Sequence, residues 1–369
     1  MAYGTVQADV IGTSVAGSNL GAGNASIMKN RLINSAMVIN QRGTVNTPVT
    51  PADGDYTVDR WWSRLSASGK YSVQQTNTTA PTGFNNALLV TSLSSYSVSA
   101  GDYFTQSQQI EGFNTADLGW GTANAKTVTL SFQVYSSLTG TFGGSLANSA
   151  VSRSYPFSYT ISNANTWTQI SITIAGDTTG TWLTTNGIGM RVWFGLGVGS
   201  TYSGTAGSWA SADYRSATGA TSVVGTNGAT FYITGVQLEV GSSATGFEYR
   251  QYQQELALCQ RYYYKWIPTS ASSYLATTMN FNTVTCYAPV KLPTTMRATP
   301  TLTTSGTATD YGGYSAATRF TLSSVPSIDT SNYDTPNLSF SVASGLTAGY
   351  AGIFGSNTTN GYLGFNAEL

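Results

Sequence analysis

The fold is decided by residues 231–241, FYITGVQLEVG, which read as a β-strand with a fault at its centre. Side chains alternate between the two faces of a strand, so Phe231 and Ile233 share one face. After Gly235 the apolar phase moves to Val236, Leu238 and Val240. A change of phase needs one inserted residue, and glycine is the usual place for such a β-bulge. We therefore predict a long, bulged strand with one buried face.

The same period of two recurs on both sides of this strand. The apolar members of three further alternating sets are Val128, Leu130, Phe132 and Val134; then Ile170, Ile172 and Ile174; then Met190, Val192, Phe194 and Leu196. Turn sequences such as Gly143-Gly144 and Asn186-Gly187 separate them. Regular strands without helical patterns between them favour an all-β sandwich or jelly roll, which we place at residues 31–248.

The pattern becomes helical after this region. Over residues 249–264 the large side chains Tyr252, Leu256, Cys259 and Tyr263 recur at spacings of four, three and four, which predicts a one-sided helix of about four turns. Pro268 is expected to end it. We assign residues 249–267 to a short linker helix that packs on one domain. A helix that packs against its own copies in an oligomer is the alternative, because the spacing is also that of a heptad.

Two further regions complete the predicted organisation. Residues 268–369 return to alternation and read as a smaller C-terminal β domain. Residues 1–30 are nearly uncharged and carry little apolar surface. Because ordering costs roughly 1–2 kcal/mol per residue, we expect this segment to be an arm that orders only against a partner, or else a plain tail.

The composition excludes several function classes. Charged residues make up 9% of the 369, and 16 positive side chains balance 16 negative ones, so we expect no nucleic-acid partner. No apolar stretch approaches the ~20 residues of a membrane span, and no secretory signal is recognised. Histidine is absent, which removes the commonest general base and metal ligand. Cys259 and Cys286 are too few for a disulfide framework, and the sequence leaves open whether they lie close.

Catalytic and metal-binding candidates are few. Asp53, Asp55 and Asp59 form the densest acidic cluster, in a turn before Arg60. Turn capping and ion pairing account for them, and a calcium site is the alternative. No serine has a histidine partner, and the glycine-rich run Gly195–Gly199 lacks a following lysine. We therefore expect a protein without a cofactor that is not an enzyme.

The ligand-binding candidates lie in the least periodic stretch, about residues 197–225. Rigid aromatic side chains among small residues are typical of adaptable binding surfaces. The candidates are Tyr202, Trp209, Asp213, Tyr214 and Arg215. A subunit contact and a plain loop are the alternatives. The strand-like positions of Trp61, Trp167, Trp182 and Trp193 instead favour the core.

Several segments together resemble the carbohydrate-binding-like jelly-roll modules of bacteriophage tail fibres and related virion proteins. They are residues 30–34 and 39–42, 56–61, 109–112, 126–134, 180–182, 231–248, 255–263, 293–300 and the final Ala-Glu-Leu. The resemblance implies a homotrimeric virion protein, made in the host cytoplasm. Its arm would dock on other virion proteins, and its β domains would adhere to a host surface glycan. It identifies no sugar-binding residue. The alternatives are a structural virion component, such as a capsid decoration or tail accessory protein, and a polysaccharide depolymerase.

Overall fold

The computed structural model describes residues 28–369. The predicted arm over residues 1–30 therefore falls almost entirely outside the described residues. The chain divides into two compact units: the first ends at Tyr252 and also takes in Leu369, and the second comprises Gln253–Glu368. Within the described residues, none of the helices has the length and apolar character needed to cross a membrane.

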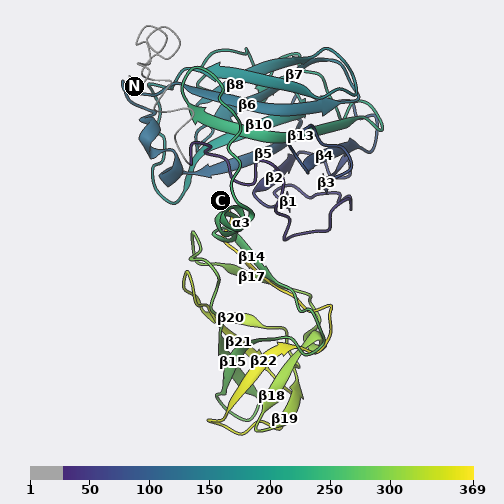
Figure 1. Ribbon diagram of the computed structural model, residues 1–369, viewed down its shortest axis with the longest axis vertical. Coiled ribbons are helices and arrows are strands. Elements are labelled where there is room, and N and C mark those ends of the chain that lie inside the picture. The colour runs from purple at the N-terminus through teal and green to yellow at the C-terminus, as the bar shows by residue number, and fades with distance from the viewer. Residues whose placement is uncertain (1–27) are drawn as a thin grey trace, which may run out of the picture. The chain divides into compact units, whose positions relative to one another are not determined.

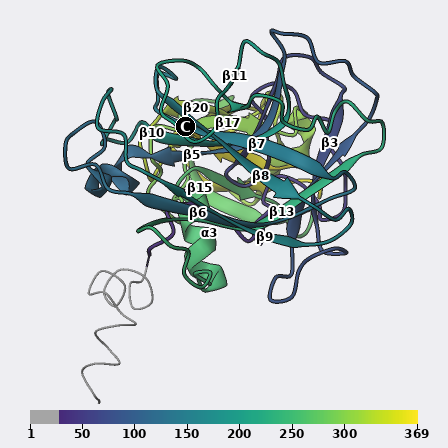
Figure 2. The ribbon, with the colours of Figure 1, turned by 90° about the horizontal axis from the view of Figure 1, so that it is seen from above.

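The first unit is an all-β jelly-roll sandwich of two antiparallel sheets, as predicted, and Figure 2 shows its two layers. The six-stranded sheet has the order β1 (Tyr56–Val58), β2 (Trp61–Leu65), β5 (Tyr103–Glu111), β10 (Ile188–Val198), β7 (Gly140–Ala147) and β8 (Ser154–Ile161). The five-stranded sheet has the order β3 (Tyr71–Thr76), β4 (Ala87–Ser92), β13 (Thr230–Val240), β6 (Val128–Ser136) and β9 (Thr168–Ile174). Short elements complete the unit: η1 (Gly112–Asn114), η2 (Ala116–Leu118), β11 (Ser203–Gly204) and β12 (Ser216–Ala217).

The core lies between the sheets and is built from the apolar phases predicted above. Phe132 of β6 and Phe194 of β10 are both fully buried, and their rings meet edge to face with centroids 5.1 Å apart. Such a contact joins the two layers, because the strands belong to different sheets. The opposite phase of each strand is left to face outward.

The bulge predicted at Gly235 is confirmed. The register of β13 against β6 shifts between Thr234 and Gln237, and Gly235 takes a left-handed φ of 61°. Phe231 and Ile233 before the bulge, and the apolar residues Val236 and Leu238 after it, are all fully buried. The inserted residue thus keeps both halves of the strand facing the core.

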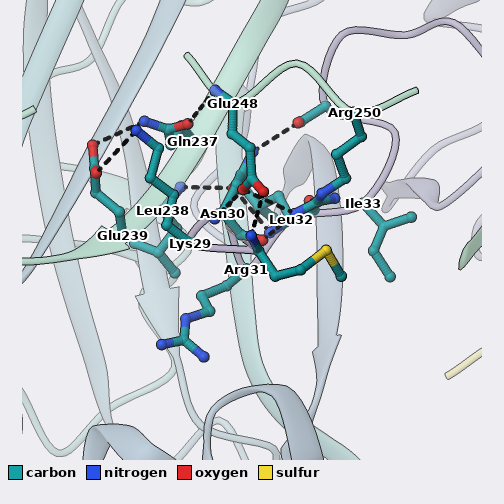
Figure 3. Close-up of polar contacts among 12 residues, drawn as sticks. Lys29, Asn30, Arg31, Leu32, Ile33, Gln237, Leu238, Glu239, Glu248 and Arg250 are labelled. Atoms are coloured by element: carbon teal, nitrogen blue, oxygen red, sulfur yellow. Dashed lines mark hydrogen bonds and ion pairs between the residues drawn. The ribbon is translucent and has the colours of Figure 1, made fainter. Parts of the chain in front are cut away.

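Segments at the two ends of the first unit meet beside the second half of β13 (Figure 3). The carboxamide of the buried Asn30 accepts from the backbone N–H groups of Leu32 and Leu238 and donates to the carbonyl of Val236. The backbone N–H of Asn30 donates to the carboxylate of Glu248, 218 residues away. Asn30 and Glu248 belong to segments that carry the resemblance, and they join distant parts of the same chain by hydrogen bonds. A structural role therefore explains these residues without any ligand.

The helix is shorter than the sequence predicted. The observed α3 (Tyr252–Gln260) ends well before Pro268, because the chain turns and enters β14 (Tyr263–Trp266). There Tyr263 pairs with Asn366 in a sheet instead of continuing the helical stripe. Tyr252, the first member of the predicted stripe, is 59% exposed. The prediction failed because Tyr263–Trp266 pair with the distant β23 in a sheet, and this pairing outweighed the local helical period.

The second unit contains two sheets and its own core (Figure 1). The seven-stranded sheet has the order β19 (Thr318–Thr321), β18 (Tyr311–Ser315), β22 (Ala351–Ser356), β15 (Tyr274–Asn280), β16 (Thr285–Pro289), β21 (Asn337–Ser341) and β20 (Ser327–Thr330). The three-stranded sheet places β23 (Leu363–Asn366) between β14 and β17 (Thr301–Thr304), and η3 (Ala308–Asp310) precedes β18. Cys259 and Cys286 are both buried in this unit, and no disulfide joins them.

Candidate functional site

An aromatic cluster lies on the outer face of the five-stranded sheet. Tyr232 of β13 is paired with Tyr135 of β6, and both point outward because the flanking Ile233 and Val134 point into the core. Trp167 immediately precedes β9, the neighbour of β6. The rings of Tyr135 and Tyr232 meet edge to face at 4.9 Å. The indole of Trp167 lies 5.6 Å from Tyr135 and 6.2 Å from Tyr232.

Two amide side chains lie next to this cluster. Gln133 of β6 is paired with Thr234 of β13 on one side and with Gln169 of β9 on the other. Both glutamines share the outward phase of Tyr135, and the amide of Gln133 donates to that of Gln169. We call the set of Tyr135, Trp167, Tyr232, Gln133 and Gln169 the aromatic platform.

The platform is partly open to solvent and uncharged. Its three rings are half-buried, while Gln169 is exposed. Burial, followed by the nearby Tyr135, raises the pKa of the Tyr232 phenol, and a hydrogen bond with the Thr79 side chain opposes this only in part. The Tyr232 hydroxyl therefore stays protonated at neutral pH and remains a hydrogen-bond donor. Amides and phenols offer donors and acceptors side by side, next to flat apolar surface.

This arrangement can bind a neutral, hydroxyl-rich ligand. Aromatic faces supply apolar contact area at a low cost in rotamer entropy, and the polar groups can fix the ligand's orientation. No proton-transfer or nucleophilic chemistry is implied by phenols and amides alone. The platform is suited to binding.

The predicted ligand-binding residues lie elsewhere and are divided between two places. Tyr202, Asp213 and Arg215 come together on the outer face of the six-stranded sheet. The guanidinium of Arg215 lies 4.5 Å from the centre of the Tyr202 ring and donates to the Asp213 carboxylate at 2.7 and 3.1 Å. Tyr214 packs locally, since its ring lies against Gly204 of β11.

Trp209 belongs to a separate tryptophan cluster. Its half-buried ring lies 5.3 Å from Trp120, 5.5 Å from Trp182 and 5.2 Å from Tyr155, all at steep angles. Its indole N–H donates to the carbonyl of Ala175 at 2.8 Å. These contacts fix the position of the loop through packing, so the structure does not join Trp209 to Arg215 in one site.

Four tryptophans were predicted to be core residues. Trp61 is fully buried and Trp193 is 2% exposed, so both predictions are confirmed. Trp167 is half-buried on the outer face of the five-stranded sheet, so for this residue the prediction was wrong. Trp182 is half-buried and packs against the core cluster, so its prediction is confirmed only in part. Trp167 precedes β9 and Trp182 lies between β9 and β10, so strand-like surroundings did not predict the burial of these two rings.

The acidic cluster does not form a calcium site. Asp53 accepts from Arg64 and from the backbone of Leu65, whereas the buried Asp59 accepts from the backbone and side chain of Gln41. Asp55 caps its own turn by accepting from the backbone N–H of Ala52. Over residues 28–369, no group of three or more acidic, cysteine or histidine side chains is placed to hold a metal ion. Turn capping and pairing account for these side chains.

The platform was missed by reasoning from the sequence, although a signal was present. The alternation of residues 128–134 assigned Thr129, Ser131 and Gln133 to the outward phase, and the next residue in that phase is Tyr135. An aromatic residue in a polar phase indicates an exposed ring. Its neighbours Trp167 and Tyr232 come from distant strands, so their grouping depended on strand order.

No protein-family model and no curated protein sequence matches the chain. Several solved structures are similar to part of the chain at a low level. The enzymatically active domain of tailspike protein 4 of bacteriophage CBA120 is 11% identical over 58% of this chain and 22% of that one, with a TM-score of 0.32. A putative sugar-binding protein from Bacteroides thetaiotaomicron is 11% identical over 57% and 100% of the two chains, with a TM-score of 0.33.

A family 11 carbohydrate-binding module from Clostridium thermocellum, in complex with a mixed-linked tetrasaccharide, is 12% identical over 54% of this chain and 99% of that one, with a TM-score of 0.28. At these levels of identity and TM-score, no ligand and no residue role is transferred to this chain.

Proposed function

We propose that the chain is a glycan-binding adhesin and that the aromatic platform contacts the glycan. The observation that carries the proposal is the grouping of Tyr135, Trp167 and Tyr232 beside two amides on an outer sheet face. Sugar rings present C–H surfaces that pack on aromatic faces and hydroxyls that pair with amides. A soluble protein that leaves three such rings half open beside polar groups carries the parts this recognition needs.

The biological setting that we propose is a bacteriophage virion, with the protein in the tail or a fibre as a homotrimer. The support is the resemblance of the segments around Asn30, Trp61 and residues 231–248 to tail-fibre modules, together with the low charge. The same setting accommodates a purely structural virion component, which would bind no glycan. We expect no enzymatic activity, because the platform offers phenols and amides instead of a pair of carboxylates.

The proposal is tested by binding of the purified full-length protein to an array of bacterial surface polysaccharides. Trp167→Ala and Gln169→Ala should each weaken binding to the recognised glycan about tenfold, a loss of about 1.4 kcal/mol. The matched control is Phe113→Ala, since Phe113 is 60% exposed but lies in η1, away from the platform. It should leave binding unchanged.

Two results would count against this function. Binding that survives removal of Trp167, Tyr135 and Tyr232 together would move the site elsewhere, and no binding to any polysaccharide would favour the structural virion component. Release of reducing ends from a bound polysaccharide identifies the third candidate, a depolymerase. That assay separates cleavage from adhesion, because adhesion leaves the chain length of the polysaccharide unchanged.

A further inference from the structure

The outer face of the six-stranded sheet carries a second, chemically different group of side chains. Arg64 of β2 and Arg191 of β10 point outward, and Arg215 reaches over them from the segment before β12. The guanidinium carbon of Arg64 lies 4.7 Å from the centre of the Trp62 ring, and that of Arg191 lies 5.7 Å from it. We call Arg64, Arg191 and Arg215 the arginine cluster.

Aromatic rings surround the arginine cluster. The guanidinium of Arg215 lies 4.0 Å from the centre of Tyr103, 4.5 Å from that of Tyr202 and 5.6 Å from that of Trp193. In the register of the sheet, Trp193 is paired with Ser107, which is itself paired with Trp62. Two indole rings thus flank the buried Ser107 beneath the three arginines.

Buried donors in this place have no partner. The indole N–H of Trp193 donates to no oxygen within hydrogen-bond distance, and the residue is only 2% exposed. The Nε of Arg191 and one terminal nitrogen of Arg215, Nη1, are likewise buried without a partner. A buried donor left unpaired costs about 1–3 kcal/mol, so natural proteins rarely gather several of them. A ligand with acceptor oxygens would supply partners for these donors.

The charges in this place are not balanced. Arg64 is paired with Asp53 and Arg215 with Asp213, at 2.7 Å each, but Arg191 has no carboxylate within ion-pair distance among the described residues. Its guanidinium donates a hydrogen bond to the backbone carbonyl of Ser149. Burial, followed by the positive charge of Arg64, lowers the pKa of the Arg191 guanidinium, and the charges of Tyr56 and Asp213 oppose this only in part.

We propose that the arginine cluster, with Trp193, is a second binding site that takes a carboxylate-bearing sugar such as a hexuronate. A carboxylate supplies two acceptor oxygens, which fit the free Nε of Arg191 and the indole N–H of Trp193. The half-buried rings of Tyr103 and Tyr202 give apolar surface for the sugar ring beside the charge. The site lies on the sheet opposite the aromatic platform and is independent of it.

The test uses the indole N–H signal of Trp193 in two-dimensional NMR of the full-length, ¹⁵N-labelled protein. The chain has eight tryptophans, and the signal is identified by its absence in Trp193→Phe. A glucuronic acid tetrasaccharide should move this signal downfield. The neutral methyl ester of the tetrasaccharide should bind at least tenfold more weakly, because it lacks the charge. Sodium sulfate should also bind at least tenfold more weakly, because it lacks the sugar ring.

Arg191→Gln should weaken binding of the acidic tetrasaccharide at least tenfold. The melting temperature should stay equal or rise, because the variant removes a buried positive charge that has no carboxylate partner. The control Arg319→Gln, with the same charge change on β19, should bind as the wild type does. Trp167→Ala should also leave the Trp193 signal responsive, which separates this site from the platform.

Three results would overturn the proposal. The first is an unmoved Trp193 signal at about 10 mM tetrasaccharide, a concentration that detects even millimolar affinity. The second is equal binding of the acid and its ester, which would remove the role of charge. The third is equal binding of sulfate and the tetrasaccharide, which would make the cluster a simple anion site without sugar recognition.

Discussion

The ring of Phe84 lies against the α-carbon of Gly235, so closely that a methyl group placed at 235 would come within 2.5 Å of the ring. Gly235 is the inserted residue of the β13 bulge, and its φ of 61° is in the left-handed region. Two separate constraints, backbone conformation and contact with Phe84, therefore require glycine here.

Gly235→Ala is expected to destabilise the first unit by about 2–3 kcal/mol, because the left-handed conformation costs about 1–2 kcal/mol and the contact with Phe84 adds to it. The control is Gly228→Ala, which has a φ of 73° but open space around the added methyl. Gly228→Ala should lose only the stability that the left-handed backbone conformation costs, about 1 kcal/mol. Urea unfolding of both variants measures the difference, and equal losses would show that Phe84 moves aside freely.

Much of the fold follows from local patterns in the sequence. Strand alternation around Phe132 and Phe194 predicts which face of each strand is buried, and the bulge at Gly235 keeps β13 in the same orientation. Both could be predicted because alternation and glycine conformation act within a few residues. The helix extent was predicted less well, since Tyr263 lies in a strand that pairs with Asn366, more than a hundred residues later. The spacing of apolar residues near Tyr263 gives no sign of so distant a partner.

The candidate site was harder to predict for the same reason. Tyr135, Trp167 and Tyr232 come from three regions of the chain, and only the strand order β13-β6-β9 brings them together. The loop containing Trp209 looked exposed because it lacks periodicity. Its ring instead fills a tryptophan cluster whose other members lie far away in sequence.

Asn30→Ala is expected to cost about 3 kcal/mol or more. The side chain is buried, its amide nitrogen donates to Ser35 and Val236, and its oxygen accepts from Leu32 and Leu238. Truncation would leave several buried backbone groups unpaired, at about 1–3 kcal/mol each. Thermal unfolding should show the loss. Asn227→Ala, at an exposed position in the same unit, should change stability by less than about 0.5 kcal/mol.

The buried ion pair of Arg153 and Asp177 should make the folding stability depend on pH in the acidic range. The Asp177 side chain is 2% exposed and receives 2.8 Å hydrogen bonds from Arg153. Burial alone would raise the pKa of Asp177, but the bonds from Arg153 and Thr179 outweigh it and lower the pKa below its usual range. A lowered folded-state pKa contributes stability that is fully present above the unfolded value of about 3.9 and is lost as the pH falls through the folded value.

Asp177→Asn should therefore lower stability at pH 7 by about 3 kcal/mol and flatten its decline below about pH 4. Melting temperatures measured from pH 7 down to pH 2 test both effects. The control Asp117→Asn removes a carboxylate that pairs with Arg31, and the Asp117 side chain is 49% exposed. It should change the curve little, because exposed pairs contribute about 0–1 kcal/mol. A parallel decline in Asp177→Asn and the wild type would assign the acid sensitivity to other groups.

Trp209→Ala and Trp167→Ala should have opposite consequences, although both rings are half-buried. Trp209 packs against the main core cluster and three aromatic rings, so its removal should cost about 2–3 kcal/mol of stability and leave glycan binding per folded molecule unchanged. Trp167 contacts only the two platform tyrosines among the aromatic rings of the described residues, and its loss should cost about 1 kcal/mol. Glycan binding should fall about tenfold in the Trp167→Ala variant, because the platform loses its largest stacking surface.

Calorimetric unfolding and polysaccharide binding, measured on the same preparations, separate the two roles. Weakened binding by a fully folded Trp209→Ala protein would return the ligand site to the loop at residues 197–225, and unchanged binding by Trp167→Ala would remove it from the platform.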